Sequence, residues 1–125
     1  MSTELTTLCE DATLEDVLKT LSLKRISGVL VVDGDGKLIG VCSEYDVLLH
    51  IRKHPTLHAA LFQERITFSR HPQVLRTTSP LREILESFVE RKFRRLPVVD
   101  ENGVLVGIVT RRDLMRVYYY RAKLS

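Results

Sequence analysis

Two short motifs each place a carboxylate three residues after a hydroxyl group. The first pairs Ser43 with Asp46, and the second pairs Thr110 with Asp113. Each hydroxyl follows an apolar run and is expected to begin a helix, where free backbone N–H groups favour anions such as phosphate. The carboxylate, one helical turn further on, can accept hydrogen bonds from two neighbouring hydroxyl groups of a sugar. The same spacing is also an ordinary helix cap, and for these four residues taken alone capping is the more common role.

The motifs lie in the two copies of an internal repeat. Segment 29–41 recurs as 96–108 with a constant offset of 67 residues, so that Gly40 corresponds to Gly107. Each copy has the pattern of a short extended segment, a helix, a β-hairpin and a second helix. A unit of about 60 residues does not bury both faces of its own small sheet, so the two copies are expected to pair.

The predicted organisation is α+β, with two pseudo-symmetric repeats that each contain a small sheet with flanking helices. Repeat 1 spans residues 1–56, a linker with the lead-in to repeat 2 occupies 57–70, and repeat 2 spans 71–125. At the offset of 67, Met1 aligns with Phe68, so the first copy lacks the lead-in that precedes the second. The chain is therefore either a free-standing module without this lead-in or a piece of a longer polypeptide.

Local signals predict where several helices begin and end. In the second copy, Ser79 is expected as the N-cap, Pro80 at the first helical position and Glu83 near the capping-box position. Pro55 is expected to end the helix before it, and a further short helix is predicted at 57–65. In both hairpin turns, glycine and asparagine are expected to supply positive φ angles.

The composition is that of a globular protein, with 44% hydrophobic and 28% charged residues in a chain of 125. No apolar run approaches the roughly 18 residues that cross a bilayer, and the N-terminal residues do not form a secretory signal. Two cysteines, Cys9 and Cys42, are too few for a disulfide framework, which predicts a cytoplasmic protein without membrane contact. Residues 64–125 carry thirteen basic against seven acidic side chains, a balance that could attract phosphate, nucleic acid or an acidic partner.

The side chains do not form a recognisable catalytic or metal-binding set. No nucleophile, base and orienting group occur together, so the chain is not expected to be an enzyme. His50, His54 and His58 recur every four residues, but Pro55 interrupts their helix. No cysteine or carboxylate completes the histidines at ligand spacing, so no metal site and no required cofactor are predicted.

The duplicated pattern resembles the CBS domain family, named for cystathionine β-synthase. The resemblance implies a tandem pair of repeats, called a Bateman module, that assembles into a homodimer. It also implies binding of AMP, ADP, ATP or S-adenosylmethionine and regulation of a partner protein or of an effector domain outside this chain. The residues that carry the resemblance are Leu96–Asp100, Gly103, Gly107–Thr110 and Asp113, with Val31–Asp33, Gly36, Gly40–Ser43 and Asp46 in the first copy.

The resemblance assigns the ligand-binding positions in each copy. Asp46 and Asp113 would bind ribose, with Ser43 and Thr110 near the ribose or the phosphate. Arg95 stands where a small residue is common, and it could intrude on the base, stack on it or reach a phosphate. The full set is Thr6, Ser27, Gly28, Ser43 and Asp46 in the first copy, and Gln73, Arg94, Arg95, Thr110, Arg112 and Asp113 in the second.

The expected function is that of a regulatory sensor of adenine nucleotides. Arg111 and Arg112 beside Thr110, against Glu44 beside Ser43, predict that the second site prefers a ligand with more phosphate charge. One alternative is a structural dimerisation module whose nucleotide sites are vestigial. Another is nucleic-acid binding through the basic second half, which is the less favoured of the two.

Overall fold

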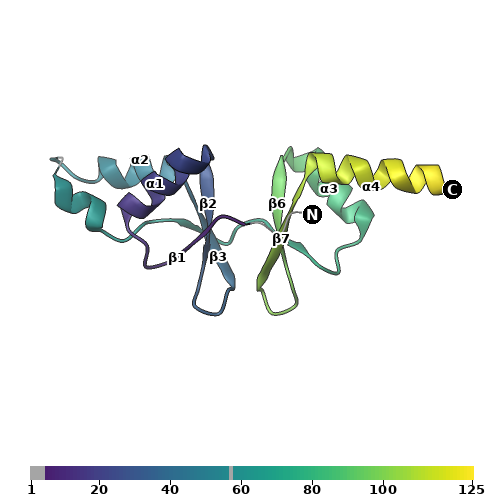
Figure 1. Cartoon of the computed structure of the whole chain (residues 1–125), viewed down its shortest axis with the longest axis horizontal. Helices are drawn as coiled ribbons and strands as arrows, with labels where there is room; N and C mark the ends of the chain where they lie inside the picture. The colour runs from purple at the N-terminus through teal and green to yellow at the C-terminus, as the bar shows by residue number, and fades with distance from the viewer. Residues whose placement is uncertain (1–4, 57) are drawn as a thin grey trace. The chain divides into compact units, whose positions relative to one another are not determined.

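The computed structural model describes residues 5–56 and 58–125, whose elements fall into two compact units (Figure 1). One unit is Thr6–Pro72, and the other is Gln73–Ser125 together with Leu5. The described residues form four α-helices, one 3₁₀ helix and seven short strands in two small mixed sheets. This confirms the predicted α+β class.

The first unit builds a four-stranded sheet in the order β1-β2-β3-β4. Strand β1 runs parallel to β2, and the other neighbours are antiparallel. The two α-helices lie on one side of this sheet (Figure 1). In chain order the elements are β1 (Thr7–Cys9), α1 (Leu14–Lys24), β2 (Gly28–Val32), β3 (Leu38–Ser43), α2 (Glu44–Arg52), the 3₁₀ helix η1 (Ala59–Gln63) and β4 (Ser69–Arg70).

The second unit builds a three-stranded sheet in the order β5-β6-β7. Strand β5 is parallel to β6, and β6 is antiparallel to β7, as in the corresponding strands of the first unit. Its two helices also lie on one side of their sheet (Figure 1). The elements are β5 (Leu75–Arg76), α3 (Leu81–Arg91), β6 (Arg95–Val99), β7 (Leu105–Thr110) and α4 (Arg111–Leu124).

The offset of 67 residues is preserved in the strand register. In the first hairpin Gly28 is opposite Ser43, and in the second Arg95 is opposite Thr110. The register shifts at the same place in both hairpins, between the last two residues of β2 and of β6. The sequence repeat is therefore a structural repeat down to single residue pairs.

The hairpin turns differ from the prediction in one respect. Gly36 and Gly103 have φ angles of 80° and 84°, as expected, but Asn102 does not have a positive φ, so that part of the prediction is wrong. The Asp100 carboxylate accepts hydrogen bonds from the backbone N–H groups of Asn102 at 2.8 Å and of Val104 at 3.0 Å. Because this side chain already shapes the turn, only the last turn residue needs the left-handed conformation.

Each unit has its own hydrophobic core between the sheet and its helices. In the first unit, Val29 and Val31 point inward from β2, with their neighbours in the strand less buried. The alternation follows from the two-residue period of a strand that is covered on one face. In the second unit the corresponding core consists of Leu75, Phe88, Leu96, Val98 and Leu114.

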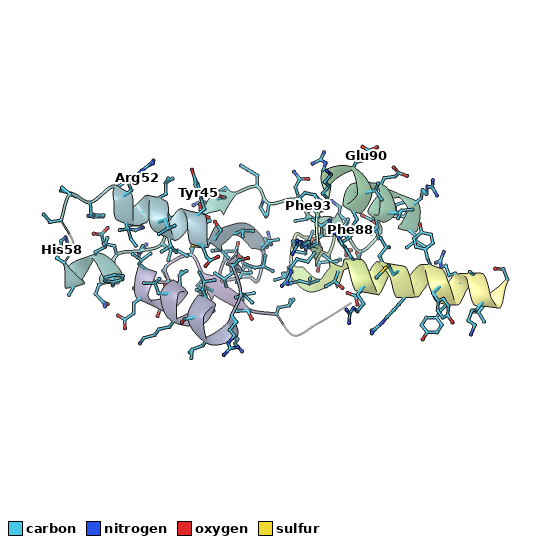
Figure 2. All side chains as sticks on the ribbon, turned by 90° about the horizontal axis from the view of Figure 1, so that it is seen from above. Tyr45, Arg52, His58, Phe88, Glu90 and Phe93 are labelled. Carbon is cyan, nitrogen blue, oxygen red and sulfur yellow. The ribbon has the colours of Figure 1, made fainter. Side chains whose placement is uncertain are left out.

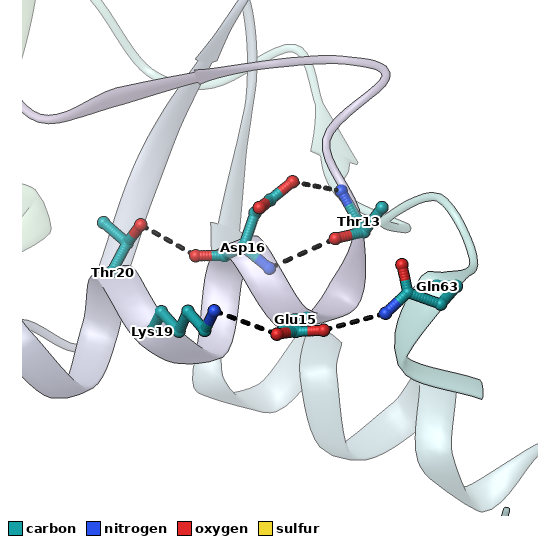
Figure 3. A network of polar contacts seen from close by, with 6 residues as sticks. All are labelled: Thr13, Glu15, Asp16, Lys19, Thr20 and Gln63. Atoms are coloured by element: carbon teal, nitrogen blue, oxygen red, sulfur yellow. Dashed lines mark hydrogen bonds and ion pairs between the residues drawn. The ribbon is translucent and has the colours of Figure 1, made fainter. Parts of the chain in front are cut away.

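The helix ends correct two sequence expectations. Helix α3 begins at Leu81 with Pro80 as its N-cap, so Ser79 is not the cap and Pro80 is not the first helical residue. The Ser79 hydroxyl instead accepts a 3.0 Å hydrogen bond from the backbone N–H of Arg76, which closes the turn before the helix. Helix α1, by contrast, begins with a capping box in which Thr13 and Asp16 bond to each other's backbone N–H groups (Figure 3).

The linker behaves largely as the sequence predicts. Helix α2 ends at Arg52, before Pro55, and the predicted short helix at 57–65 is the 3₁₀ helix η1 over 59–63, while Leu57 lies outside the described residues. Gln63 at the end of η1 donates a 2.8 Å hydrogen bond to Glu15 on α1, which fixes η1 to the first unit (Figure 3). Among the residues that the structure covers, no helix is long and apolar enough to cross a membrane.

Candidate functional site

In the first unit, the residues predicted to bind a ligand gather at one end of the sheet. Gly28 at the start of β2 is opposite Ser43 at the end of β3. The Ser27 carbonyl accepts a 3.0 Å hydrogen bond from the backbone N–H of Glu44, the first residue of α2. These bonds place the loop before β2 beside the start of α2.

Asp46 is a helix-capping residue in this structure. Its Oδ2 accepts hydrogen bonds from the backbone N–H of Ser43 at 2.9 Å and from the Ser43 hydroxyl at 3.0 Å. Its Oδ1 accepts a 3.2 Å hydrogen bond from the hydroxyl of Ser69 in β4. A carboxylate has about four acceptor positions, so the two bonds from Ser43 and the one from Ser69 together occupy most of them at Asp46. A sugar hydroxyl would have to share Oδ1 with Ser69 or displace it.

The second unit repeats this junction. Asp113 Oδ2 accepts a 2.8 Å hydrogen bond from the backbone N–H of Thr110, and the Thr110 hydroxyl accepts one of 3.2 Å from the Asp113 backbone N–H. The backbone N–H of Thr110 is the main cause that lowers the pKa of Asp113, so this carboxylate is ionised at neutral pH. The Arg94 carbonyl accepts a 3.1 Å hydrogen bond from the backbone N–H of Arg111, just as Ser27 accepts one from Glu44.

The sequence predicts that Arg111 favours a polyphosphate ligand, but in the structure its side chain binds the protein itself. Its guanidinium donates to the carbonyls of Phe93 at 2.6 Å and of Lys92 at 2.8 Å, so it fastens the loop that follows α3. The guanidinium groups of Arg94, Arg95 and Arg112 belong to exposed residues, with Arg95 directly opposite Thr110 in the hairpin. The structure leaves these three arginines, rather than Arg111, as candidates for contact with phosphate.

Thr6 and Gln73 lie at the corresponding ends of the two sheets. Thr7 pairs with Leu30 in parallel strands, so Thr6 lies toward the end of the sheet at which Gly28 begins β2. Gln73 precedes β5 in the same way, and its side-chain oxygen accepts a 2.8 Å hydrogen bond from Arg91 on α3. Within the described part of the chain, no hydrogen bond joins Thr6 or Gln73 to the capping acids.

The first unit also has a hollow at the opposite end of its sheet. Its volume is about 520 Å³, and Cys9 and Val32, the last residues of β1 and β2, contribute to its wall. None of the residues predicted to bind a ligand lines it. The hollow is therefore separate from the candidate site at the start of α2.

The sequence predicts no metal site at the histidines near the end of α2, but the structure places a carboxylate beside two of them. Glu64 Oε1 lies 3.2 Å from the Nε2 atom of His50 and 3.2 Å from that of His54. The expectation that no carboxylate completes the histidines is wrong, because η1 returns the chain to the end of α2. The hydrogen bond with His50 is the main cause that lowers the pKa of Glu64. The signal in the sequence was the pair of histidines four residues apart.

Comparison with known proteins identifies the family. The model of the CBS domain matches residues 1–53 and 65–120. The Arabidopsis thaliana protein CBSX2, described as chloroplastic and CBS domain-containing, is 30% identical, and the match covers 82% of this chain and 54% of that protein. The uncharacterized protein MJ1426 of Methanocaldococcus jannaschii is also 30% identical, with 85% of this chain and 81% of that protein covered.

Solved structures support the same assignment. A crystal structure of CBSX2 in complex with AMP has a TM-score of 0.72 and 30% identity, covering 95% of this chain and 90% of that one. The cytosolic domain of the Mg²⁺ channel MgtE in complex with ATP has a TM-score of 0.72 and 31% identity. The match covers 94% of this chain and 46% of that one. The chain spans about half the length of CBSX2 (54%) and of its relative CBSX1 (55%). With two matched repeats that share one register, the chain belongs to the CBS domain family.

Proposed function

We propose that this chain is a regulatory module that binds adenine nucleotides and acts by binding rather than by catalysis. The observation that carries the proposal is the strand–helix junction, which is built in the same way in both units. In each, a hydroxyl residue caps the helix and a carboxylate lies three residues later, at Ser43 and Asp46 and again at Thr110 and Asp113. CBS proteins of about 30% identity whose structures hold AMP or ATP support the choice of ligand class.

The proposed ligand uses the helix start for its sugar and phosphate. The backbone N–H groups of the first turn and the capping hydroxyl favour an anion there. Asp46 or Asp113 would accept hydrogen bonds from the ribose hydroxyls, in contacts worth about 1.5–3 kcal/mol each when a charged acceptor is involved. The base would lie near Thr6, Ser27 and Gly28 in the first unit. In the second unit it would lie near Gln73, Arg94 and Arg95.

The two proposed sites differ in charge. Arg94, Arg95 and Arg112 are exposed near the helix start of the second unit, whereas Glu44 is the first helical residue of the first. Guanidinium groups bind phosphate through several parallel hydrogen bonds. We therefore propose that the second site prefers ATP or ADP over AMP, and that the first shows the reverse order.

Regulation would follow from a difference in affinity. A ligand shifts an equilibrium between two arrangements only when it binds one of them more tightly. We propose that the controlled element is a partner protein or an effector domain attached to the module, in the cytoplasm. The free state of both cysteines, Cys9 and Cys42, is compatible with that reducing location.

Isothermal titration of the purified chain with AMP, ADP, ATP, NAD and S-adenosylmethionine tests the proposal. Saturable heat with at least one adenine ligand is the expected result. If no ligand gives heat while the chain sediments as a stable dimer, the module is structural and its sites are vestigial. If the chain instead binds DNA or RNA with a steep salt dependence and ignores free nucleotides, its basic second half is a nucleic-acid surface.

We further propose that the module forms a homodimer through α2 and α4. Leu48 on α2 and Met115 on α4 are equivalent at the offset of 67, and they are 66% and 65% exposed. Tyr45 also points away from the core of the first unit (Figure 2) and is 69% exposed. Apolar side chains repeated at matching positions fit burial against a second copy. Sedimentation velocity of the variants Leu48→Glu and Met115→Glu tests this proposal. We expect both variants to shift toward the monomer, and an unchanged dimer would contradict the proposal.

A further inference from the structure

The histidine cluster in the first unit joins the end of α2 to the residue after η1. His50 lies in the last turn of α2, and His54 lies two residues beyond the end of the helix, where its backbone N–H donates a 3.0 Å hydrogen bond to the carbonyl of Ile51. Their rings stack with centroids 5.7 Å apart and an angle of 14° between the ring planes. Both Nε2 atoms approach a single oxygen, Glu64 Oε1, at 3.2 Å each. Two nitrogens and one oxygen thus converge from two segments of the chain.

The spacing of these three atoms suits a small divalent metal ion. Zinc binds histidine nitrogen and carboxylate oxygen at about 2.0–2.2 Å in tetrahedral geometry, which places neighbouring ligand atoms about 3.3 Å apart. The two distances to Glu64 Oε1 match that separation, and all three candidate ligand atoms lie within 4.8 Å of one another.

The core of the first unit holds the His50 side chain and the Glu64 backbone in place. His50 is only 5% exposed, although the ring is polar. The Glu64 backbone N–H donates to the carbonyl of Leu61, which is fully buried, and the Glu64 carbonyl accepts a 2.9 Å hydrogen bond from the backbone N–H of Leu14. Glu64 is therefore fixed to α1 and η1 by its backbone. Because these groups are already positioned, the protein loses less conformational entropy when a metal ion binds.

We propose that His50, His54 and Glu64 form a binding site for a divalent transition metal ion of the zinc type, with a fourth position open to water or to His58. The ring of His58 packs edge-on against that of His54 at 6.1 Å between centroids. The partial negative charge at the C-terminal end of a helix favours a cation at this place. With this ligand set and an open position, the site resembles two-histidine, one-carboxylate zinc centres in its chemistry.

The site is independent of the proposed nucleotide site. Ser43 and His50 are separated by seven residues, or about 10 Å along a helix. Figure 2 shows the same separation, with Tyr45 near one end of α2 and His58 beyond the other end, past Arg52. A metal here would tie η1 to α2 and so stabilise the segment that leads into the second repeat.

The surroundings predict a moderate affinity. When a metal ion binds Nε2 of a neutral histidine, the proton moves to Nδ1, which is usually held by an acceptor in the outer shell. His50 Nδ1 is buried, and among the described residues it has no hydrogen-bond partner. We therefore expect micromolar rather than nanomolar binding of zinc.

Titration of the untagged full chain with ZnCl₂ tests the proposal. We expect one ion per chain and a rise in the thermal midpoint with zinc. His54→Ala and Glu64→Gln should each weaken zinc binding by at least about tenfold, since losing an outer-shell partner alone costs that much. The matched control is His71→Asn, which removes the exposed fourth histidine and retains a residue that tolerates its φ of 61°.

Cobalt provides a second measurement on the unmodified chain. Co²⁺ in a protein site of this kind should give the visible absorption of four-coordinate cobalt, and zinc should abolish it. The proposal is overturned if Co²⁺ shows only its aqueous spectrum, or if zinc fails to bind at millimolar concentration. It is also overturned if zinc binding falls as much in His71→Asn as in His54→Ala.

Discussion

The hydroxyl of Ser69 donates a 3.2 Å hydrogen bond to Oδ1 of Asp46 and so joins β4 to the start of α2. Strand β4 also pairs with β3, where Ser69 is opposite Val41. The acid proposed to bind ribose is thus bonded directly to the strand through which the chain leaves the first unit. A ligand whose hydroxyl groups donate hydrogen bonds to Asp46 would alter the bonding of β4. This provides a physical path from ligand binding to the segment before the second repeat.

Ser69→Ala should weaken this communication without removing the site. In the unmodified chain we expect a bound nucleotide to change the hydrogen exchange of the amides of Ser69 and Arg70, because both belong to β4. In Ser69→Ala the nucleotide should still bind, but the change in exchange should shrink. Thr67→Ala, an exposed change in the same segment, serves as the control. An equal change in all three proteins would contradict the proposed path.

Gly40→Ala should destabilise the first unit. A Cβ atom at Gly40 would overlap the ring of Phe68 and would lie 2.5 Å from the Ser69 carbonyl oxygen. Because backbone cannot move aside without breaking the β3–β4 pairing, we expect a loss of about 1–3 kcal/mol in the free energy of unfolding, measured in urea. Gly34→Ala is the matched control, since nothing lies within 4 Å of its Cβ position. Equal stability of the two variants would rule out this close packing.

The repeat made most of the fold predictable from the sequence. Matching apolar runs at an offset of 67 were enough to align the two hairpins, and the structure pairs Gly28 with Ser43 and Arg95 with Thr110 at that offset. Helical periodicity and Pro55 placed the helices because both are local signals. One local signal gave a wrong prediction. Ser79 is of a type that favours the N-cap position, but its hydroxyl accepts a hydrogen bond from the backbone N–H of Arg76 instead.

Contacts between distant residues could not be predicted in this way. Glu64 reaches His50 because the chain returns to the end of α2 through η1, and the sequence predicts a short helix here but not how it packs. Arg111 directly follows the capping residue Thr110, and from the sequence its guanidinium is expected to lie near a phosphate. In the structure the guanidinium instead donates hydrogen bonds to two carbonyls of the loop after α3. Long side chains can reach several partners, so their contacts depend on tertiary packing rather than on their position in a motif.

The stability contributed by Asp16 should depend on pH. The backbone N–H of Thr13 is the main cause that lowers the pKa of Asp16 below its usual value of 3.8. A carboxyl group whose pKa is lower in the folded state stabilises the protein at any pH above its pKa in the unfolded state. This stabilisation is lost as the pH falls through the pKa of the folded state. Asp16→Asn should therefore unfold at lower urea concentration than the unmodified chain at pH 7. The difference should shrink as the pH is lowered below about 4. A difference that is constant with pH would contradict this.

The two cysteines should differ in reactivity. Burial, together with the nearby charge of Asp46, raises the pKa of the Cys42 thiol to about 11, whereas Cys9 is exposed. Since the thiolate is the reactive form, iodoacetamide at pH 8 should label Cys9 in the folded protein and spare Cys42. Mass spectrometry of Cys9→Ser should show no label until urea is added. Rapid labelling of the folded Cys9→Ser protein would show that Cys42 is accessible.

The most direct test of nucleotide binding compares three Asp→Asn variants that remove the same kind of charge. Asp46, Asp113 and Asp16 each accept a hydrogen bond from the backbone N–H of a capping residue, at 2.9, 2.8 and 2.9 Å. Only the first two lie at a proposed site. In calorimetric titrations with AMP and ATP, Asp46→Asn and Asp113→Asn should each weaken one site by about tenfold or more, as expected for a lost charge-assisted contact. Asp16→Asn should bind like the unmodified chain. Equal binding by all three variants, or equal loss in all three, would show that these acids only cap their helices.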